Sequence, residues 1–147
     1  SNADCTKTGG SMGKEKIKIR YIVILPVLIC ALIFIRKLMK LNDLDAKEVA
    51  EIILVSPPYK KRITDQQEIE EFTRMFNNRK KRFVFSIINS SGWSKRAIIS
   101  MGTRQYDIIF CGENITVNRL KYVMDESIDS ELDQFYRSLN ETEEEYN

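Results

Sequence analysis

The sequence predicts an α+β protein: one small domain with an antiparallel sheet of about five strands and helices packed on one face, preceded by one N-terminal transmembrane helix. Three observations lead to this prediction. A charge-free apolar run occupies residues 21–35, two later stretches have apolar residues at helical spacing, and several short β-type runs are separated by Gly, Asn and Ser. The order of strand, helix, several strands and helix is typical of an antiparallel sheet with helices on one side.

The apolar run, YIVILPVLICALIFI, has basic residues on both sides. Its fifteen residues would rise about 22 Å as a helix, against a hydrocarbon core of about 30 Å. The apolar residues that follow, and Lys and Arg stems that reach the membrane interface, extend the segment. A buried core helix would have a polar stripe, and this run has none. We therefore expect a membrane anchor at residues 21–41, in which Pro26 is tolerated.

We expect the anchor to be retained, because Arg36 and Lys37 follow the run where a signal-peptidase site needs small residues. Residues 1–20 are interpreted as a tag remnant and a basic arm. Five basic residues precede the run and three follow it closely, so the positive-inside bias favours a cytoplasmic N-terminus. The expected location is the cell membrane, with a single pass and the soluble domain extracellular.

Behind the anchor, we expect a linker at residues 42–47, the soluble α+β domain at residues 48–140 and an acidic tail at residues 141–147. The domain begins with a β-type run at residues 49–55. Pro57 and Pro58 end this strand, since proline cannot donate a hydrogen bond to a ladder. Residues 59–62 are interpreted as a basic connection.

Two amphipathic helices follow from the spacing of apolar residues. Thr64 opens the first with capping-box spacing to Gln67, and Ser127 is the candidate N-cap of the second. Their apolar faces consist of Ile69, Phe72, Met75 and Phe76, and of Ile128, Leu132, Phe135, Tyr136 and Leu139. Between them we expect a meander of short strands at residues 83–88, 96–101, 106–110, 115–117 and 122–124.

Several short motifs resemble small domains of Gram-positive bacteria that follow a membrane anchor or lipoprotein signal and whose function is unknown. These motifs are Pro57-Pro58, Ile63-Thr64-Asp65 with Glu68-Ile69, Gly92-Trp93, Tyr106-x-Ile108-x-Phe110, Asn114-Ile115-x-Val117-Asn118 and Tyr122-x-Met124. The resemblance covers residues 49–139 and consists mostly of turn and core residues. It implies a location and a fold, and it supplies no catalytic residue.

The composition excludes several kinds of site. The chain has no histidine, only Cys111 lies in the domain and no CxxC pair occurs, which excludes a zinc site of Cys and His ligands. From residue 46 onward the net charge is −2, so the positive charge lies around the anchor and nucleic acid is not an expected partner. We expect no cofactor, no metal and no catalytic residue.

The candidate binding surface combines one aromatic residue with two basic clusters. Trp93, between two predicted strands, is either a contact anchor or a side chain folded over the sheet edge. The clusters could form one patch for anionic lipid or an acidic polymer. Alternatively, basic residues near a helix C-terminus complement its dipole. The clusters consist of Lys60, Lys61 and Arg62, and of Arg79, Lys80, Lys81 and Arg82.

Other reactive side chains favour structural interpretations. Cys111 has no histidine to activate it, so a partly buried structural cysteine is favoured. The carboxylate pairs Asp125 with Glu126 and Asp129 with Glu131 stand around a helix N-terminus, where caps and solvated charges are expected. An enzyme would need Cys111, Asp107 and a basic residue together in a cleft.

The leading hypothesis is a non-catalytic binding module, held at the cell envelope by the N-terminal membrane helix. Its partner would be an envelope protein, a peptide or an anionic polymer. We expect contact at the sheet face not covered by helices, with Trp93 and the basic loops at its rim. The alternative is a cytoplasm-facing, membrane-tethered regulator that binds a protein or nucleic acid through those loops.

Overall fold

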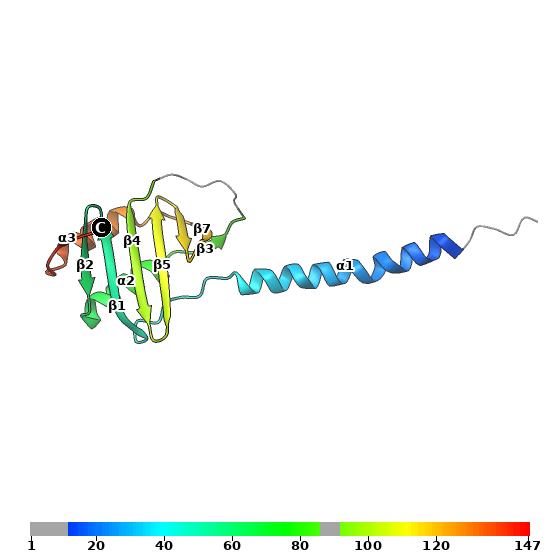
Figure 1. The fold of residues 1–147 in the computed structure, drawn as a ribbon, viewed down its shortest axis with the longest axis horizontal. Helices are drawn as coiled ribbons and strands as arrows, with labels where there is room; N and C mark the ends of the chain where they lie inside the picture. The colour runs from blue at the N-terminus through cyan, green and yellow to red at the C-terminus, as the bar shows by residue number, and fades with distance from the viewer. Residues whose placement is uncertain (1–11, 86–91) are drawn as a thin grey trace, which may run out of the picture. The chain divides into compact units, whose positions relative to one another are not determined.

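The structure is a computed structural model that describes residues 12–85 and 92–147, with side chains described from residue 22 on except at residue 38. The chain divides into two compact units between Lys40 and Leu41. The first unit contains helix α1, and the second contains the other elements that the structure describes (Figure 1).

Helix α1 (Met12–Leu38) contains the apolar run and Pro26. Its large apolar side chains are exposed along the described length, from Ile22 at 70% to Ile35 at 44%. Because this segment has no polar stripe, the exposed surface is apolar on every side. Among the described residues, no helix is long and apolar enough to cross a membrane.

In the described part of the second unit, eight strands form one antiparallel sheet (Figure 1). The order across the sheet is β3-β7-β6-β5-β4-β1-β2-β8. The strands are β1 (Val49–Ser56), β2 (Tyr59–Ile63), β3 (Lys81–Phe83), β4 (Lys95–Met101), β5 (Arg104–Cys111), β6 (Asn114–Val117), β7 (Leu120–Met124) and β8 (Glu144–Glu145). The α+β class with an antiparallel sheet is confirmed, whereas the predicted number of about five strands is wrong.

Two polar strands, β2 and β8, were not predicted, and a third polar strand, β3, is displaced from its prediction. The basic connection after Pro58 is β2, which forms a hairpin with β1 and turns Lys61 and Ile63 inward. The acidic tail contributes β8, which pairs with β2. β3 shares only Phe83 with the strand predicted at residues 83–88, of which residues 86–88 lie outside the described residues. Pairing with neighbours, rather than side-chain hydrophobicity, makes these segments strands.

Helices α2 (Gln66–Asn77) and α3 (Asp129–Ser138) lie on the same side of the sheet (Figure 1). Their rings join the helices to each other and to the sheet. Phe72 and Phe135 have ring centroids 6.2 Å apart, and Phe76 meets Phe110 of β5 edge-on at 6.5 Å. The sheet residues under the helices are Ile52, Leu54, Ile63, Ala97, Ile99, Ile108, Phe110, Ile115, Val117, Tyr122 and Met124, and all are buried.

The N-cap of α2 is Asp65, one residue after the predicted Thr64. Asp65 Oδ1 accepts hydrogen bonds from the N–H groups of Gln67 at 2.9 Å and Glu68 at 3.1 Å. At α3, the Ser127 Oγ accepts from the N–H of Asp129 at 3.2 Å, although Ile128 occupies the N-cap position. Serine, threonine and aspartate are all good caps, so only the backbone path distinguishes Asp65 from Thr64.

We expect Asp65→Ala to lower the free energy of unfolding by about 1 kcal/mol, because two N–H groups of α2 lose their acceptor. Thr64→Ala, at the neighbouring exposed position, should change it by less than about 0.5 kcal/mol. Urea unfolding followed by circular dichroism measures both. If Thr64→Ala lowered the free energy of unfolding more than Asp65→Ala, Thr64 would be the N-cap, as the sequence predicts.

The ends of the domain lie elsewhere than predicted. In the expected linker at residues 42–47, Leu44 is buried. Its N–H donates to Asn77 Oδ1 at 2.9 Å, and its carbonyl accepts from Asn77 Nδ2 at 2.8 Å. At the other end, the expected acidic tail is part of the sheet, and the Tyr146 N–H donates to the Pro58 carbonyl at 2.9 Å. Both segments therefore belong to the folded unit.

Candidate binding surface on the open face of the sheet

The first basic cluster lies on β2, and its three members have different roles. Lys61 is buried and its Nζ donates to the carbonyls of Tyr136 at 3.0 Å and Leu139 at 2.8 Å. It therefore satisfies carbonyls at the C-terminus of α3. Lys60 and Arg62 point to the opposite side of the sheet, where Lys60 pairs with Glu144 at 3.5 Å and Arg62 pairs with Glu51.

The second cluster follows α2 and leads into β3. Lys81 Nζ donates to the carbonyls of Phe76 and Arg79, both at 2.6 Å, and lies 4.3 Å from the centroid of the Phe76 ring. Burial lowers the pKa of Lys81. Arg79 pairs with Glu131 and, at 3.8 Å, with Glu126. Lys80 and Arg82 are exposed and remain accessible to solvent.

The structure does not bring the two clusters together into one patch. Five strands separate β2 from β3 in the sheet order. At about 4.8 Å per strand spacing, β2 and β3 are roughly 29 Å apart. Each cluster supplies one lysine that satisfies carbonyls at a helix C-terminus, which agrees with the alternative interpretation.

The sheet face turned away from α2 and α3, called the open face below, mixes apolar residues with charged ones, and the Arg96–Asp107 pair lies near its centre. The strand register places one row of residues across it. From β2 to β7 this row consists of Lys60, Val55, Arg96, Ile109, Thr116 and Lys121. Ile53 and Ile98 extend the apolar part along a neighbouring row.

Trp93 lies over this face just before β4, and it is 38% exposed. It lines a pocket of about 330 Å³ whose other walls include Ile109 and Cys111 of β5, Thr116 of β6, and Arg119 in the turn before β7. The Trp93 ring also meets Tyr146 edge-on, with centroids 6.3 Å apart. The lining combines the Trp93 ring and apolar Ile109 with polar side chains and the basic Arg119, which suits a ligand with an apolar group and an acidic group.

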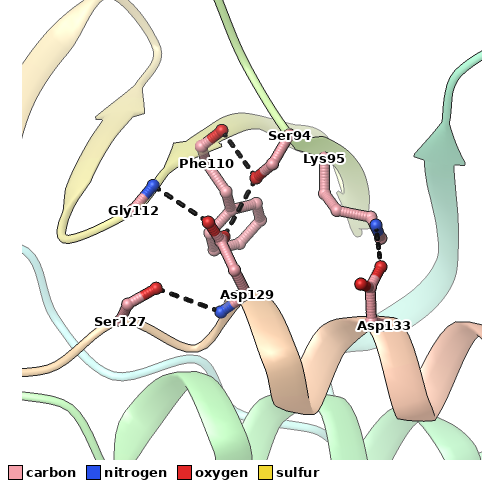
Figure 2. A network of polar contacts seen from close by, with 7 residues as sticks. All are labelled: Ser94, Lys95, Phe110, Gly112, Ser127, Asp129 and Asp133. Atoms are coloured by element: carbon pink, nitrogen blue, oxygen red, sulfur yellow. Dashed lines mark hydrogen bonds and ion pairs between the residues drawn. The ribbon is translucent and has the colours of Figure 1, made fainter.

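A polar network anchors the chain next to Trp93 (Figure 2). Ser94 Oγ lies 3.1 Å from the Phe110 carbonyl and 2.9 Å from Asp129 Oδ1. The Gly112 N–H donates to Asp129 Oδ2 at 3.0 Å. The first residue of α3 thus holds the start of β4 and the end of β5 together. Asp129, expected to be a cap or a solvated charge, in fact positions the residue that follows Trp93.

Arg96 lies on the open face between the tail and the centre of the sheet. Its Nε and Nη2 donate to the two carboxylate oxygens of Asp107, both at 2.8 Å, and its Nη1 donates to the Tyr146 hydroxyl. The hydrogen bonds to Asp107 raise the pKa of Arg96. Sequence reasoning missed Arg96 and Tyr146, because 50 residues separate them and neither belongs to a motif.

The arrangement expected of an enzyme is not assembled at Cys111. Asp107 and Cys111 lie on the same side of β5 but four residues apart, which is about 13 Å along a strand. Asp107 is held by Arg96 and does not line the pocket that contains Cys111. Within the described ranges, no group of three or more metal-ligating side chains could hold a metal ion.

A second hollow, of about 510 Å³, lies between the β1–β2 hairpin and α3. Two of the charged residues that line it are already engaged within the domain. Lys61 binds the carbonyls at the end of α3, and Asp133 accepts from Lys95. We therefore assign structural roles to these two residues.

The Lys95–Asp133 pair gives a pH-dependent contribution to stability (Figure 2). The hydrogen bond from Lys95 holds the pKa of Asp133 below its ordinary value of 3.8. Because the folded pKa is depressed, this contribution is present above the unfolded pKa and is lost as pH falls through the folded pKa. We expect Asp133→Asn to lower the melting temperature at neutral pH, with a difference that vanishes in strong acid. Lys95→Met should remove the same pH dependence. If the melting temperature of Asp133→Asn stayed below that of the unaltered chain by a constant amount down to strong acid, the Lys95–Asp133 pair would not be its cause.

Comparisons of this chain with protein-family models, with curated proteins and with solved structures find no match. The resemblance to small membrane-anchored domains of Gram-positive bacteria therefore stays a prediction. The candidate surface consequently depends on the geometry of the open face alone.

Proposed function

We propose that the protein is a non-catalytic binding module that contacts its partner through the open face and is held at a membrane by the apolar segment of α1. The observation that carries the binding proposal is the combination around Trp93. An accessible aromatic ring lines a pocket with apolar, polar and basic side chains, on the face that the helices leave uncovered. Tryptophan and arginine at such places are the side chains enriched in binding hot spots.

The membrane proposal is supported by the exposed surface of α1. Ile22, Val23 and Leu25 are each more than half exposed, and the same holds for most of the large apolar residues up to Phe34. Exposed apolar area of this kind marks contact with lipid or with another protein. Lys and Arg residues on both sides of the run suit the headgroup region. The expected site is the cell envelope, with the domain outside.

The alternative regulator would bind its partner through the basic loops, but most of the basic side chains there are already engaged within the domain. Lys61 and Lys81 satisfy helix carbonyls, while Lys60, Arg62 and Arg79 are paired with carboxylates. The two clusters also lie at opposite ends of the sheet. We therefore keep the open face as the contact surface.

Flotation with anionic lipid vesicles tests the membrane part. The full chain is expected to float, whereas Leu25→Glu with Ile29→Glu is expected to stay in the dense fraction, because two charges in the apolar run oppose insertion. Protease shaving of intact cells carrying a C-terminal epitope then tests orientation. Loss of the epitope agrees with an external domain, and loss only after lysis would reverse the assignment.

Photo-crosslinking tests the binding part. A benzoylphenylalanine at Thr116 on the open face is expected to give a discrete adduct in cells. Benzoylphenylalanine in place of Gln134, which is exposed on α3, is expected to give no adduct. Adducts from Gln134 alone would move the contact surface to the helical side and overturn the proposal.

A further inference from the structure

The C-terminal tail binds the domain in the way that an extended peptide binds the edge of a sheet. Strand β8 pairs antiparallel with β2, with Lys60 opposite Glu144 and Tyr59 opposite Glu145. The Tyr146 N–H continues this contact by donating to the Pro58 carbonyl. Addition of a strand to an exposed edge is a recurring mode of peptide recognition, in which backbone bonds provide affinity and side-chain contacts provide specificity.

The side chains of the tail reach specific groups of the domain body. Glu144 pairs with Lys60 at 3.5 Å. The Tyr146 hydroxyl accepts from Arg96, and the Tyr146 ring meets Trp93 edge-on. The carboxylate of Glu144 thus meets a cation on β2. The hydroxyl of Tyr146 meets a donor on β4, and its ring meets the aromatic ring just before β4.

Val55 indicates that the tail covers part of the open face. The register places Val55 on this face, directly between Lys60 and Arg96. Val55 is nevertheless fully buried, and it is not part of the core under the helices. Because its two neighbours hold Glu144 and Tyr146, we attribute its burial to the tail.

The tail is held lightly. Its strand contains two residues, and both are exposed. The side chains of the Lys60–Glu144 pair are 29% and 55% exposed. Exposed ion pairs contribute at most about 1 kcal/mol, and a short edge strand adds few contacts. A tail held in this way can leave the surface without unfolding the domain.

We propose that the β2 edge, with Lys60, Arg96 and Trp93, is a recognition site for an extended peptide in which acidic residues precede a tyrosine. The C-terminal tail is the resident occupant that such a partner displaces. This inference rests on the proposed function and names the partner class of the open face. β2 supplies backbone hydrogen bonds, Lys60 selects a carboxylate, Arg96 selects a phenolic oxygen and Trp93 selects an aromatic ring.

Charge favours a partner with the chemistry of the tail. Lys60 and Arg96 lie in one row of the open face, and the tail brings Glu144 and Tyr146 to them. An attached tail has an effective concentration on the order of millimolar, so an unattached peptide competes poorly with it. A site whose tail is docked nine-tenths of the time loses about tenfold in apparent affinity.

The test uses a fluorescein-labelled peptide of residues 140–147, NETEEEYN, and the full chain in detergent. Anisotropy titration is expected to show at least about tenfold tighter binding to Tyr146→Ala than to the unaltered chain, because the resident tail is weakened. Tyr146→Phe should lie between them, since it keeps the ring and loses the acceptor for Arg96. A peptide with alanine in place of its tyrosine is the control, and it should not bind.

Trp93 provides a second readout, because it is the only tryptophan in the chain. Its emission is expected to shift in Tyr146→Ala and to return when the unlabelled peptide is added. Arg96→Met in the Tyr146→Ala chain is expected to lower peptide affinity at least about tenfold, with circular dichroism reporting that the domain remains folded.

Absence of peptide binding to a folded Tyr146→Ala chain would overturn the inference. The crosslinking test at Thr116 does not depend on this peptide. A crosslink from Thr116 without peptide binding would therefore reject this site and leave the proposed function in place. Light scattering adds a second distinction. If the unaltered chain formed dimers that depend on the tail, the occupant would be the tail of a second copy. A peptide from another protein would then be ruled out as the occupant.

Discussion

Replacement of Phe72 by alanine is expected to lower the free energy of unfolding by about 3–5 kcal/mol. Phe72 is completely buried, and its ring lies 6.2 Å from that of Phe135. It therefore joins α2 to α3 over the middle of the sheet. The loss combines the transfer free energy of the ring with the cavity that remains, because the surrounding strands relax only partly.

Urea unfolding monitored by circular dichroism measures this loss, and the chain offers a matched control. Phe85 is 84% exposed. Phe85→Ala makes the same chemical change and should alter the free energy of unfolding by less than about 0.5 kcal/mol. Equal effects of the two substitutions would mean that α2 and α3 do not pack together on the sheet.

Lys61→Met is expected to lower the free energy of unfolding by about 2–3 kcal/mol. The methionine keeps the apolar stem but leaves the carbonyls of Tyr136 and Leu139 without the ammonium donor. A buried polar group that loses its partner costs about 1–3 kcal/mol. The contact of Lys61 Nζ with the Tyr136 ring, 4.8 Å from its centroid, is lost as well.

Arg62→Met is the control, because Arg62 follows Lys61 directly and points to the other side of the sheet. Its ion pair with Glu51 is partly exposed and should contribute less than about 1 kcal/mol. Chemical unfolding of the two variants under the same conditions gives the comparison. If Arg62→Met were the more damaging change, the inward direction of Lys61 would be incorrect.

The sequence predicted the elements whose own side chains carry the signal. Phe72 and Phe76 recur at helical spacing in α2, and Leu132 and Phe135 do so in α3. In β5, Tyr106, Ile108 and Phe110 alternate with Asp107 and Ile109, and this period of two predicted the strand. Such patterns are local, and burial of one face is enough to select them.

The polar strands could not be predicted in the same way. β2 reads YKKRI and β8 reads EE, and neither is hydrophobic enough to indicate a strand. β2 exists because it forms a hairpin with β1, and β8 exists because β2 otherwise forms the edge of the sheet. Similarly, Thr64 and Asp65 are both suitable caps, and the backbone path chose Asp65.

For the candidate site, the sequence singled out Trp93 between two predicted strands, as either a contact anchor or a side chain folded over the sheet edge, but it did not single out the neighbours of Trp93. Arg96, Asp129 and Tyr146 come from three distant segments, and only the folded chain places them around it. The sequence allowed the two basic clusters to form one patch, yet the sheet order separates them. Proximity along the chain does not give proximity across a sheet.

The sequence by itself determined the α+β class, the two apolar helix faces, the apolar run of α1 and the absence of histidine. These properties depend on which side chains are present and on their period. Only the tertiary structure decided the number of strands, the burial of Lys61 and the return of the tail to Trp93 and Arg96. Those features depend on pairings between segments far apart in the chain, and no local pattern encodes which partner a polar segment will meet.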